Sequence, residues 1–320
     1  KGYIFTHPEY WLISLGHDLI LDHISEATTS LHQLDTFEIS ELTEKYKFYY
    51  FIFKGTYYLT IGEYHIALEN FQAAKRIDIS LDNIEKAEFY FKLGTIYYHF
   101  RKTIDSVHNI SLALSLFKTI PGYERRVAAC EIALGLNCVN LQQWEEAEER
   151  FYNALNYANK VNDTSMKALI FHDLGLLYAE QNLSKAAVHW FNESMKFNEP
   201  DHKTIYLLCR EYFKLNDIDN GKRWLKQGIL LSEKQNLDVY LRRFNLLKVL
   251  YLETNETIFE QTLKNEIQFF VKEELWNHVD ENAQLLADFY SKKENYQKAV
   301  EYYQLMIKAQ KHILKMGALR

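Results

Sequence analysis

A group of small and aromatic residues recurs along the chain at nearly constant spacing. The group occurs in full three times, as Gly55, Tyr58, Ala67, Phe71 and Ala74, as Gly135, Cys138, Ala147, Phe151 and Ala154, and as Gly175, Tyr178, Ala187, Phe191 and Ser194. Small residues allow two helices to approach closely, and the ring four residues after the alanine fills the space beside the contact. The pattern predicts a stack of helix pairs.

The leading small residue of the group can be followed through most of the chain. Equivalent positions hold Gly55, Gly94, Gly135, Gly175, Cys209, Lys248 and Ala287, with steps of 39, 41, 40, 34, 39 and 39 residues. This is typical of tetratricopeptide (TPR) repeats, whose simple period is about 34 residues. We therefore predict an all-α, TPR-like right-handed superhelix of helix pairs. Lys248 fits the pattern poorly, so the sixth unit is degenerate.

The predicted domain organisation has two parts. Residues 1–45 are expected to form a helical N-terminal lead-in, and residues 46–320 a peptide-binding and oligomerisation domain of about seven TPR-like repeats. At the start of the chain, residues 9–34 and 38–60 are each predicted to be helical.

Composition excludes several classes of protein. The net charge of −6 argues against a broad nucleic-acid-binding face. Cys130, Cys138 and Cys209 show no paired spacing, which favours a reducing compartment. The first twenty residues lack the order of a signal peptide, and no apolar run is long enough to cross a bilayer, so we expect no membrane partner.

Motifs that carry catalysis are missing from the sequence. There is no GxxxxGK[ST], no GxGxxG after a strand, no HExxH and no GxSxG, and His, Cys and Asp are scattered without the spacing of a nucleophile and its base. On this ground we expect no enzymatic activity, no catalytic residue, no cofactor and no metal site.

Polar residues on the first helix of each unit are the candidates for a binding site, because this helix lines the concave side of a TPR superhelix. An Asn carboxamide both donates and accepts hydrogen bonds, as a peptide unit does, and an Arg pairs with a carboxylate. We predict a peptide-binding site formed by Glu131, Asn137, His172, Asp173, Tyr178, Glu180, Arg210, Arg243 and Asn245.

Structural explanations stand beside this prediction. Asn137 has equal reason to bond a neighbouring helix, and Asp173 to pair with a basic residue of the next unit. Arg210 and Arg243 are equally explained as ion pairs between repeats. His172 is better explained as a groove residue than as a metal ligand, because no second ligand follows at i+4. The sequence leaves these alternatives open.

Two segments resemble a known family. Residues 82–107, DNIEKAEFYFKLGTIYYHFRKTIDSV, closely resemble a segment of the Rap proteins of Bacillus, and residues 46–71 resemble their aromatic-rich helix. A weaker likeness continues to residue 310. Rap proteins belong to the RRNPP group of quorum-sensing receptors, which includes NprR and PlcR. The resemblance implies a cytoplasmic receptor that binds a short, re-imported signalling peptide in its TPR groove. Asn137 stands at a peptide-contacting position of the family, and Asp173 stands where the family often has Asn.

The type of family member is also predicted. Only about 45 residues precede the aromatic run, which is short for a Rap N-terminal bundle, and a start at Lys1 fits a chain without its DNA-binding domain. We therefore expect an NprR-like transcription regulator without its N-terminal helix-turn-helix. The resemblance implies that peptide switches it between oligomeric states, as homodimer or tetramer, that it meets DNA only through the missing domain, and that a sporulation response regulator is a further partner.

Two alternatives to the NprR-like regulator remain. One is a Rap-type inhibitor of a response regulator, which promotes dephosphorylation in the sporulation phosphorelay or blocks a competence activator. The other is a generic TPR scaffold that binds protein C-termini. Lys54, Ile132 and Leu136 stand where a co-chaperone TPR has its Lys/Asn/Lys/Arg clamp, which is a poor match.

Overall fold

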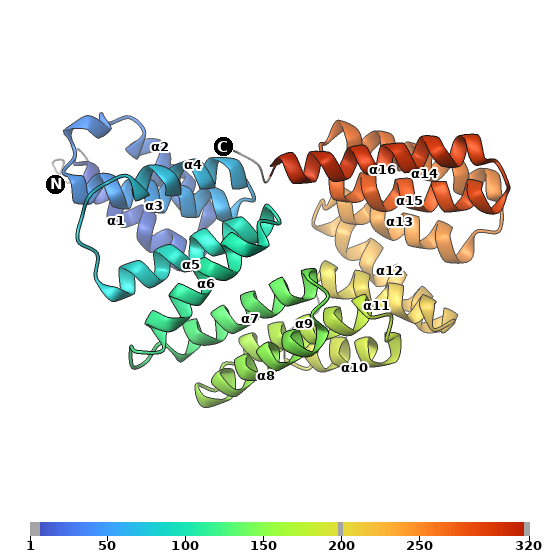
Figure 1. The fold of residues 1–320 in the computed structure, drawn as a ribbon, viewed down its shortest axis with the longest axis horizontal. Coiled ribbons are helices and arrows are strands. Elements are labelled where there is room, and N and C mark those ends of the chain that lie inside the picture. The colour runs from blue at the N-terminus through green and yellow to red at the C-terminus, as the bar shows by residue number, and fades with distance from the viewer. Residues whose placement is uncertain (1–6, 198–200, 317–320) are drawn as a thin grey trace. The chain divides into compact units, whose positions relative to one another are not determined.

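The fold is built of antiparallel helix pairs (Figure 1). The computed structural model describes residues 7–197 and 201–316, and in this part of the chain it has sixteen α-helices, one short 3-10 helix and no strand. The predicted all-α, TPR-like fold class is thereby confirmed. The chain divides into two compact units, residues 1–126 and 127–320. The predicted boundary between residues 45 and 46 stays a prediction.

The first unit begins with helices that pack around one apolar cluster. Its elements are α1 (Pro8–Ile20), α2 (Ile24–Leu34), η2 (Ile39–Glu41), α3 (Glu44–Thr60), α4 (Tyr64–Lys75), α5 (Asn83–His99) and α6 (Thr103–Phe117). Leu15, Leu31 and Tyr50 bring α1, α2 and α3 together in that cluster. The prediction of one helix over 9–34 is wrong, because Asp22 adopts a left-handed conformation with φ 58° that ends α1.

The second unit continues the array. Its helices are α7 (Glu124–Asn140, which begins three residues before the division), α8 (Trp144–Lys160), α9 (Thr164–Glu180), α10 (Ser184–Ser194), α11 (His202–Lys214), α12 (Ile218–Lys234), α13 (Asp238–Leu252), α14 (Glu256–Lys272), α15 (Trp276–Lys292) and α16 (Tyr296–Met316). Along this unit α9 contacts α11, and α11 contacts α13. Helices α9, α11 and α13 therefore lie beside one another and can form one continuous surface.

The recurrent glycines mark the closest approach between the helices of a pair. A Cβ atom added at Gly55 would lie 2.6 Å from the ring of Phe71, and one added at Gly175 would lie 2.5 Å from the ring of Phe191. Both rings are fully buried. A larger residue at the glycine would thus overlap the ring, which explains why the sequence couples a small residue with a phenylalanine sixteen positions later.

Turns between paired helices follow one scheme. Several helices end two residues before a residue with φ between 53° and 59°, and these are Gln142, Asn162, Asn182, Asn216 and Asn236. A left-handed residue just after a helix lets the last carbonyl groups find partners, and Asn tolerates this conformation well. Short turns of this kind hold the paired helices antiparallel and fix their register.

Candidate functional site

Helices α9 and α11 are linked through three of the predicted residues. The Nδ1 atom of His172 lies 2.8 Å from the hydroxyl of Thr204, whose backbone N–H is bonded by the N-cap residue Asp201. Burial lowers the pKa of His172, and the charge of Asp201 opposes this only in part. Near the other end of α9, a carboxylate oxygen of Glu180 lies 3.9 Å from Nη2 of Arg210. These contacts fix the register of α9 against α11.

Arg210 is also held by the residue next to it. Its Nε atom donates to Glu211 at 2.8 Å, and this carboxylate has no exposed surface. Glu211 accepts from Ser184 at 2.6 Å and pairs with Lys214 at 3.0 Å. The buried charge is therefore compensated by two cations and a hydroxyl, as such a charge requires. Arg210 is half-buried, and its guanidinium is oriented before any ligand arrives.

Arg243 on α13 is positioned by aromatic rings. Its guanidinium carbon lies 3.9 Å from the centre of the Tyr206 ring on α11 and 5.2 Å from that of Tyr240. The positive charge of Arg243 also acts on the carboxylate of Glu281 on α15. Burial raises the pKa of Glu281, but His278 at 3.5 Å and the charges of Arg243 and Arg210 bring that pKa below its usual value. Basic groups on α11 and α13 and an acidic group on α15 thus interact electrostatically in one region of the second unit.

Three predicted residues are engaged within the helix packing. Glu131 is 2 % exposed and pairs with Arg150 at 3.1 Å. The side-chain nitrogen of Asn137 donates to the Ala133 carbonyl at 2.8 Å, and the residue has no exposed surface. The hydroxyl of Tyr178 donates to Glu148 at 2.6 Å. A ligand could reach Glu131 or Asn137 only if the helices around them repack.

Asp173 is a buried carboxyl group on α9. It is 4 % exposed, and its Oδ2 atom has no hydrogen-bond partner among the described residues. Burial raises its pKa to about 8. A carboxyl group in this environment binds a proton in preference to carrying a charge, so it can donate a hydrogen bond near neutral pH.

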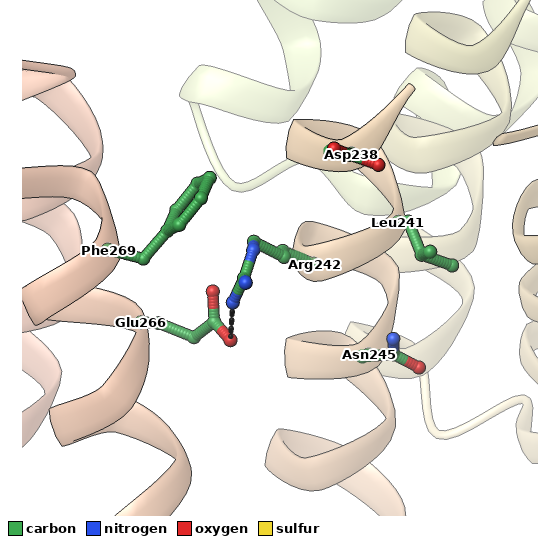
Figure 2. Close-up of a pocket in the computed structure, with 6 residues that line it drawn as sticks. All are labelled: Asp238, Leu241, Arg242, Asn245, Glu266 and Phe269. Carbon is green, nitrogen blue, oxygen red and sulfur yellow. Dashed lines mark hydrogen bonds and ion pairs between the residues drawn. The ribbon is translucent and has the colours of Figure 1, made fainter. Parts of the chain in front are cut away.

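Asn245, the last predicted residue, lines a pocket between α13 and α14. The pocket has a volume of about 380 Å³ and is lined by Asp238, Leu241, Arg242, Asn245, Glu266 and Phe269. Figure 2 shows the side chains of Arg242, Glu266 and Phe269 pointing toward one another in the space between the two helices. Arg242 donates to Glu266 at 3.0 Å and lies 3.8 Å from the ring centre of Phe269.

The structure thus brings some predicted residues together and separates others. His172, Glu180, Arg210 and Arg243 belong to the row of α9, α11 and α13, whereas Glu131 lies in packing around α7 and α8. Sequence reasoning missed the tyrosines under Arg243 and the charged residues Arg242 and Glu281. The last two are separated by the repeat step of 39 residues, so aligning polar residues across units could have found them.

Among the residues that the structure describes, no helix is long and apolar enough to cross a membrane. Within the same residues, no cluster of three or more His, Cys, Asp or Glu side chains could hold a metal ion.

Comparison with known proteins agrees with the repeat architecture. Models of the tetratricopeptide repeat match residues 126–199 and residues 281–312. Over 320 residues the chain is 24% identical to Response regulator aspartate phosphatase I of Bacillus subtilis (strain 168), covering 96% of this chain and 81% of that protein. It is 25% identical to Regulatory protein RapF of the same organism, covering 93% and 82%.

Solved structures show the same fold. A Rap protein complexed with Competence and Sporulation Factor matches with a TM-score of 0.85 and 22% identity, over 97% of this chain and 88% of that one. NprR in complex with its cognate peptide NprX matches with a TM-score of 0.78 and 17% identity, over 95% and 88%. At this level of identity the two structures establish the fold alone.

The relatives change two of the predictions. They favour the Rap-type alternative over the NprR-like regulator, because Rap proteins match in sequence across almost the whole chain. The prediction of no enzymatic activity is wrong, since homologues of the chain are named response regulator aspartate phosphatases. That prediction relied on the absence of motifs for catalytic nucleophiles and cofactor sites. Hydrolysis of a labile phosphate on a partner protein does not require those motifs.

The tetratricopeptide repeats, the helical fold and the sequence similarity along nearly all of the chain lead to one family. The chain is homologous to the Rap proteins of Bacillus and has the TPR fold that Rap proteins and NprR share.

Proposed function

We propose that this chain is a Rap-type regulator that acts on a response regulator and is itself controlled by a short signalling peptide. The observation that carries the proposal is the sequence similarity to Rap proteins over 96% of the chain, which includes both compact units and not the repeats alone. Relatives of this length are named response regulator aspartate phosphatases and regulatory proteins. An NprR-like role has support at the level of fold only.

The chemistry of an aspartyl phosphate is compatible with a helical protein. An acyl phosphate is a reactive group, and its hydrolysis needs a water molecule in line with the bond that breaks and compensation of charge on the phosphoryl oxygens. A helix surface that positions one polar side chain beside the phosphate of the partner supplies the first requirement. No nucleophile, metal or cofactor of the chain's own is needed for this step.

For the peptide we propose the surface of α9, α11, α13 and α15. Glu180, Arg210, Arg243 and Glu281 provide both signs of charge there, and Arg210 and Arg243 are oriented by Glu211 and Tyr206. Preorganised side chains lose little conformational freedom on binding, which favours affinity for a short ligand. His172 and Asn245 flank this surface, on α9 and α13.

Phosphate hydrolysis tests the first part of the proposal. Receiver domains labelled with 32P-aspartyl phosphate are incubated with the purified chain, and the remaining label is followed with time. We expect the half-life of at least one receiver domain to fall about tenfold or more. A complementary gel-shift measurement detects a response regulator that the chain removes from DNA. If no receiver domain loses phosphate faster and none is displaced from DNA, the proposal is wrong.

Peptide binding is tested with two matched arginine variants. Synthetic peptides of about five to seven residues are titrated by calorimetry into the chain, into Arg243→Gln and into Arg223→Gln. Arg223 also lies near an aromatic ring, that of Trp224, but belongs to α12. For a peptide that binds, we expect Arg243→Gln to weaken binding about tenfold, and Arg223→Gln to change it by less than about twofold. Equal affinities would place the peptide elsewhere.

A further inference from the structure

The helix pair α13 and α14 departs from the repeat at its contact positions. In the units that begin with a glycine, this residue faces the side chain sixteen positions later, as Gly175 faces the Phe191 ring. In α13 and α14 the two positions hold Lys248 and Lys264. Lys248 is exposed, and Lys264 pairs with Glu260 on its own helix. Two ammonium groups cannot replace a ring packed on a glycine, so this pair lacks the close approach that the repeat makes in those units.

The packing of α13 is directed toward α12 instead. The ring of Phe244 is fully buried, and it occupies the space that a Cβ atom at Gly228 on α12 would need. Toward α14, helix α13 contributes Leu246 and Leu250 to the apolar cluster of α14, α15 and α16. Beside this contact lies the pocket of about 380 Å³ between α13 and α14 (Figure 2). Helix α13 is therefore packed closely on α12 and leaves open space against α14.

The connection between α13 and α14 differs from its neighbours as well. The turn from α12 to α13 contains Asn236 with φ 53°, and the turn from α14 to α15 contains Glu274 with φ 55°. A left-handed residue of this kind fixes the turn, because it lets the last carbonyl groups of the helix find partners. The structure describes all of residues 253–255, and none of them is left-handed. Glu253 is extended, with φ −92° and ψ 132°.

We infer that the connection between α13 and α14 is a hinge, at which the block α14–α16 changes its angle to the block α8–α13. Hinges are a few residues between packed elements whose backbone dihedral angles can change, and residues 253–255 lie at such a place. The contact residues, the direction of packing and the connection all depart from the repeat at this one pair.

An ion pair holds the hinge in the observed position. Arg242 on α13 donates to Glu266 on α14 at 3.0 Å, and its guanidinium lies 3.8 Å from the centre of the Phe269 ring. Glu266 is 8 % exposed, so it has little water at hand to replace Arg242 as a partner. Opening of the hinge must break this pair, and loss of the pair must favour opening.

The hinge bears on peptide control, and this consequence rests on the proposed function. Arg243 lies on α13 and Glu281 on α15, so the surface proposed for the peptide includes groups of both blocks. A peptide that contacts both residues binds one hinge angle more tightly than others and shifts the chain toward that angle.

Distances between spin labels, measured by pulsed electron resonance, test the hinge in the full chain without peptide. The three cysteines of the chain are buried, so cysteines introduced at exposed positions are labelled selectively. Labels at Lys226→Cys on α12 and Lys308→Cys on α16 span the hinge. The matched pair, at Glu149→Cys on α8 and Lys226→Cys, also spans four helices but lies within one block.

We expect the distance distribution across the hinge to be about twice as wide as that of the matched pair. Arg242→Gln is expected to widen the distribution across the hinge by about half, because it removes the ion pair. Asn245→Leu adds apolar volume to the pocket and is expected to narrow this distribution by about a third. Arg223→Gln, which removes an arginine from α12, is the control and is expected to change neither distribution.

Equal widths for the two label pairs would overturn the inference. So would a distribution across the hinge that neither Arg242→Gln nor Asn245→Leu changes. Asn245→Leu keeps the test decisive if Arg242→Gln fails to fold, because it strengthens the contact between α13 and α14. These measurements need neither peptide nor response regulator, so failure of the proposed function is recognised separately. If a bound peptide leaves the distribution across the hinge unchanged, the consequence for peptide control is wrong.

Discussion

Buried carboxyl groups in the second unit are stabilised in two ways. Glu211 and Glu131 are paired with basic side chains, since Arg210, Lys214 and Arg150 lie within hydrogen-bonding or ion-pairing distance. Asp173 differs from these two residues, because burial raises its pKa to about 8. A buried carboxyl group therefore serves as an ion-pair partner at two positions and favours the neutral form at the third.

Asp173→Asn tests this difference. The folded-state pKa of about 8 lies above the ordinary value of 3.8, so the folded chain binds the proton more tightly than the unfolded chain. Its contribution to stability is complete below about pH 4 and is lost as the pH rises toward about 8. We expect Asp173→Asn to raise the free energy of unfolding by about 1–3 kcal/mol at pH 8.5 and to change it little at pH 4. Denaturant titrations of the wild type and of Asp173→Asn at both pH values measure these free energies of unfolding.

Asp163→Asn is a suitable control for that experiment, because Asp163 caps the same helix near the surface. Its effect on stability should not increase between pH 5 and pH 8.5, because Asp163 accepts a hydrogen bond at the helix N-terminus and is not buried as Asp173 is. If Asp173→Asn is less stable than the wild type at pH 8.5, Asp173 is charged in the folded chain and finds a partner there.

At the scale of the element, the distance between paired helices is set by a glycine and a ring. Gly55, Gly135 and Gly175 each face the phenylalanine sixteen residues later. In the region where the sequence pattern is weakest, the pairing changes. Gly228 on α12 faces Phe244 on α13, and Gly221 faces Phe213 on the preceding helix α11. The spacing of sixteen residues is kept between Gly228 and Phe244, whereas Phe213 precedes Gly221 by eight residues.

Gly175→Ala is expected to destabilise the chain by about 1–3 kcal/mol, because its Cβ atom would lie 2.5 Å from two atoms of the Phe191 ring. The variant Gly175→Ala with Phe191→Leu removes that overlap. We expect the double variant to be more stable than the sum of the two single effects predicts, by about 0.5 kcal/mol or more. Urea denaturation of the wild type, the two single variants and the double variant measures the four free energies of unfolding. Strictly additive effects would show that the Phe191 ring is not what excludes the methyl group of the alanine.

At the scale of the whole molecule, contacts within the second unit are made between helices close in sequence. Helix α9 contacts α8, α10 and α11, and α15 contacts α14 and α16. In arrays of this kind stability is approximately a sum over repeats and their interfaces with nearest neighbours. A local change is therefore expected to have a local effect.

Hydrogen exchange on Gly175→Ala checks this expectation. We expect faster amide exchange in α9 and α10, a smaller increase in α8 and α11, and rates in α15 and α16 that change by less than about twofold. The wild-type chain under the same conditions is the reference. An equal increase across the whole second unit would mean that it unfolds as a single cooperative block.

Much of the architecture was predictable because it depends on periodic residue types. The glycine–phenylalanine pairs identified the helix pairs, and the segments around residues 46–71 and 82–107 indicated the family that the relatives confirm. Absence of known catalytic motifs was a poor guide to activity, because it says nothing about chemistry on a partner's phosphate. The helix break at Asp22 was missed, since it depends on one residue that tolerates a left-handed conformation.

The sequence by itself determined the repeat, the all-α fold and the Rap-like family, because close helix packing demands small and aromatic residues at fixed intervals. Only the tertiary structure decided which polar residues are engaged in packing and which are available. Glu131 and Asn137 are buried, Arg243 packs on the ring of Tyr206, and Arg242 pairs with Glu266 between α13 and α14. Side-chain partners come from neighbouring helices whose residues lie tens of positions away, so the repeat pattern does not encode them.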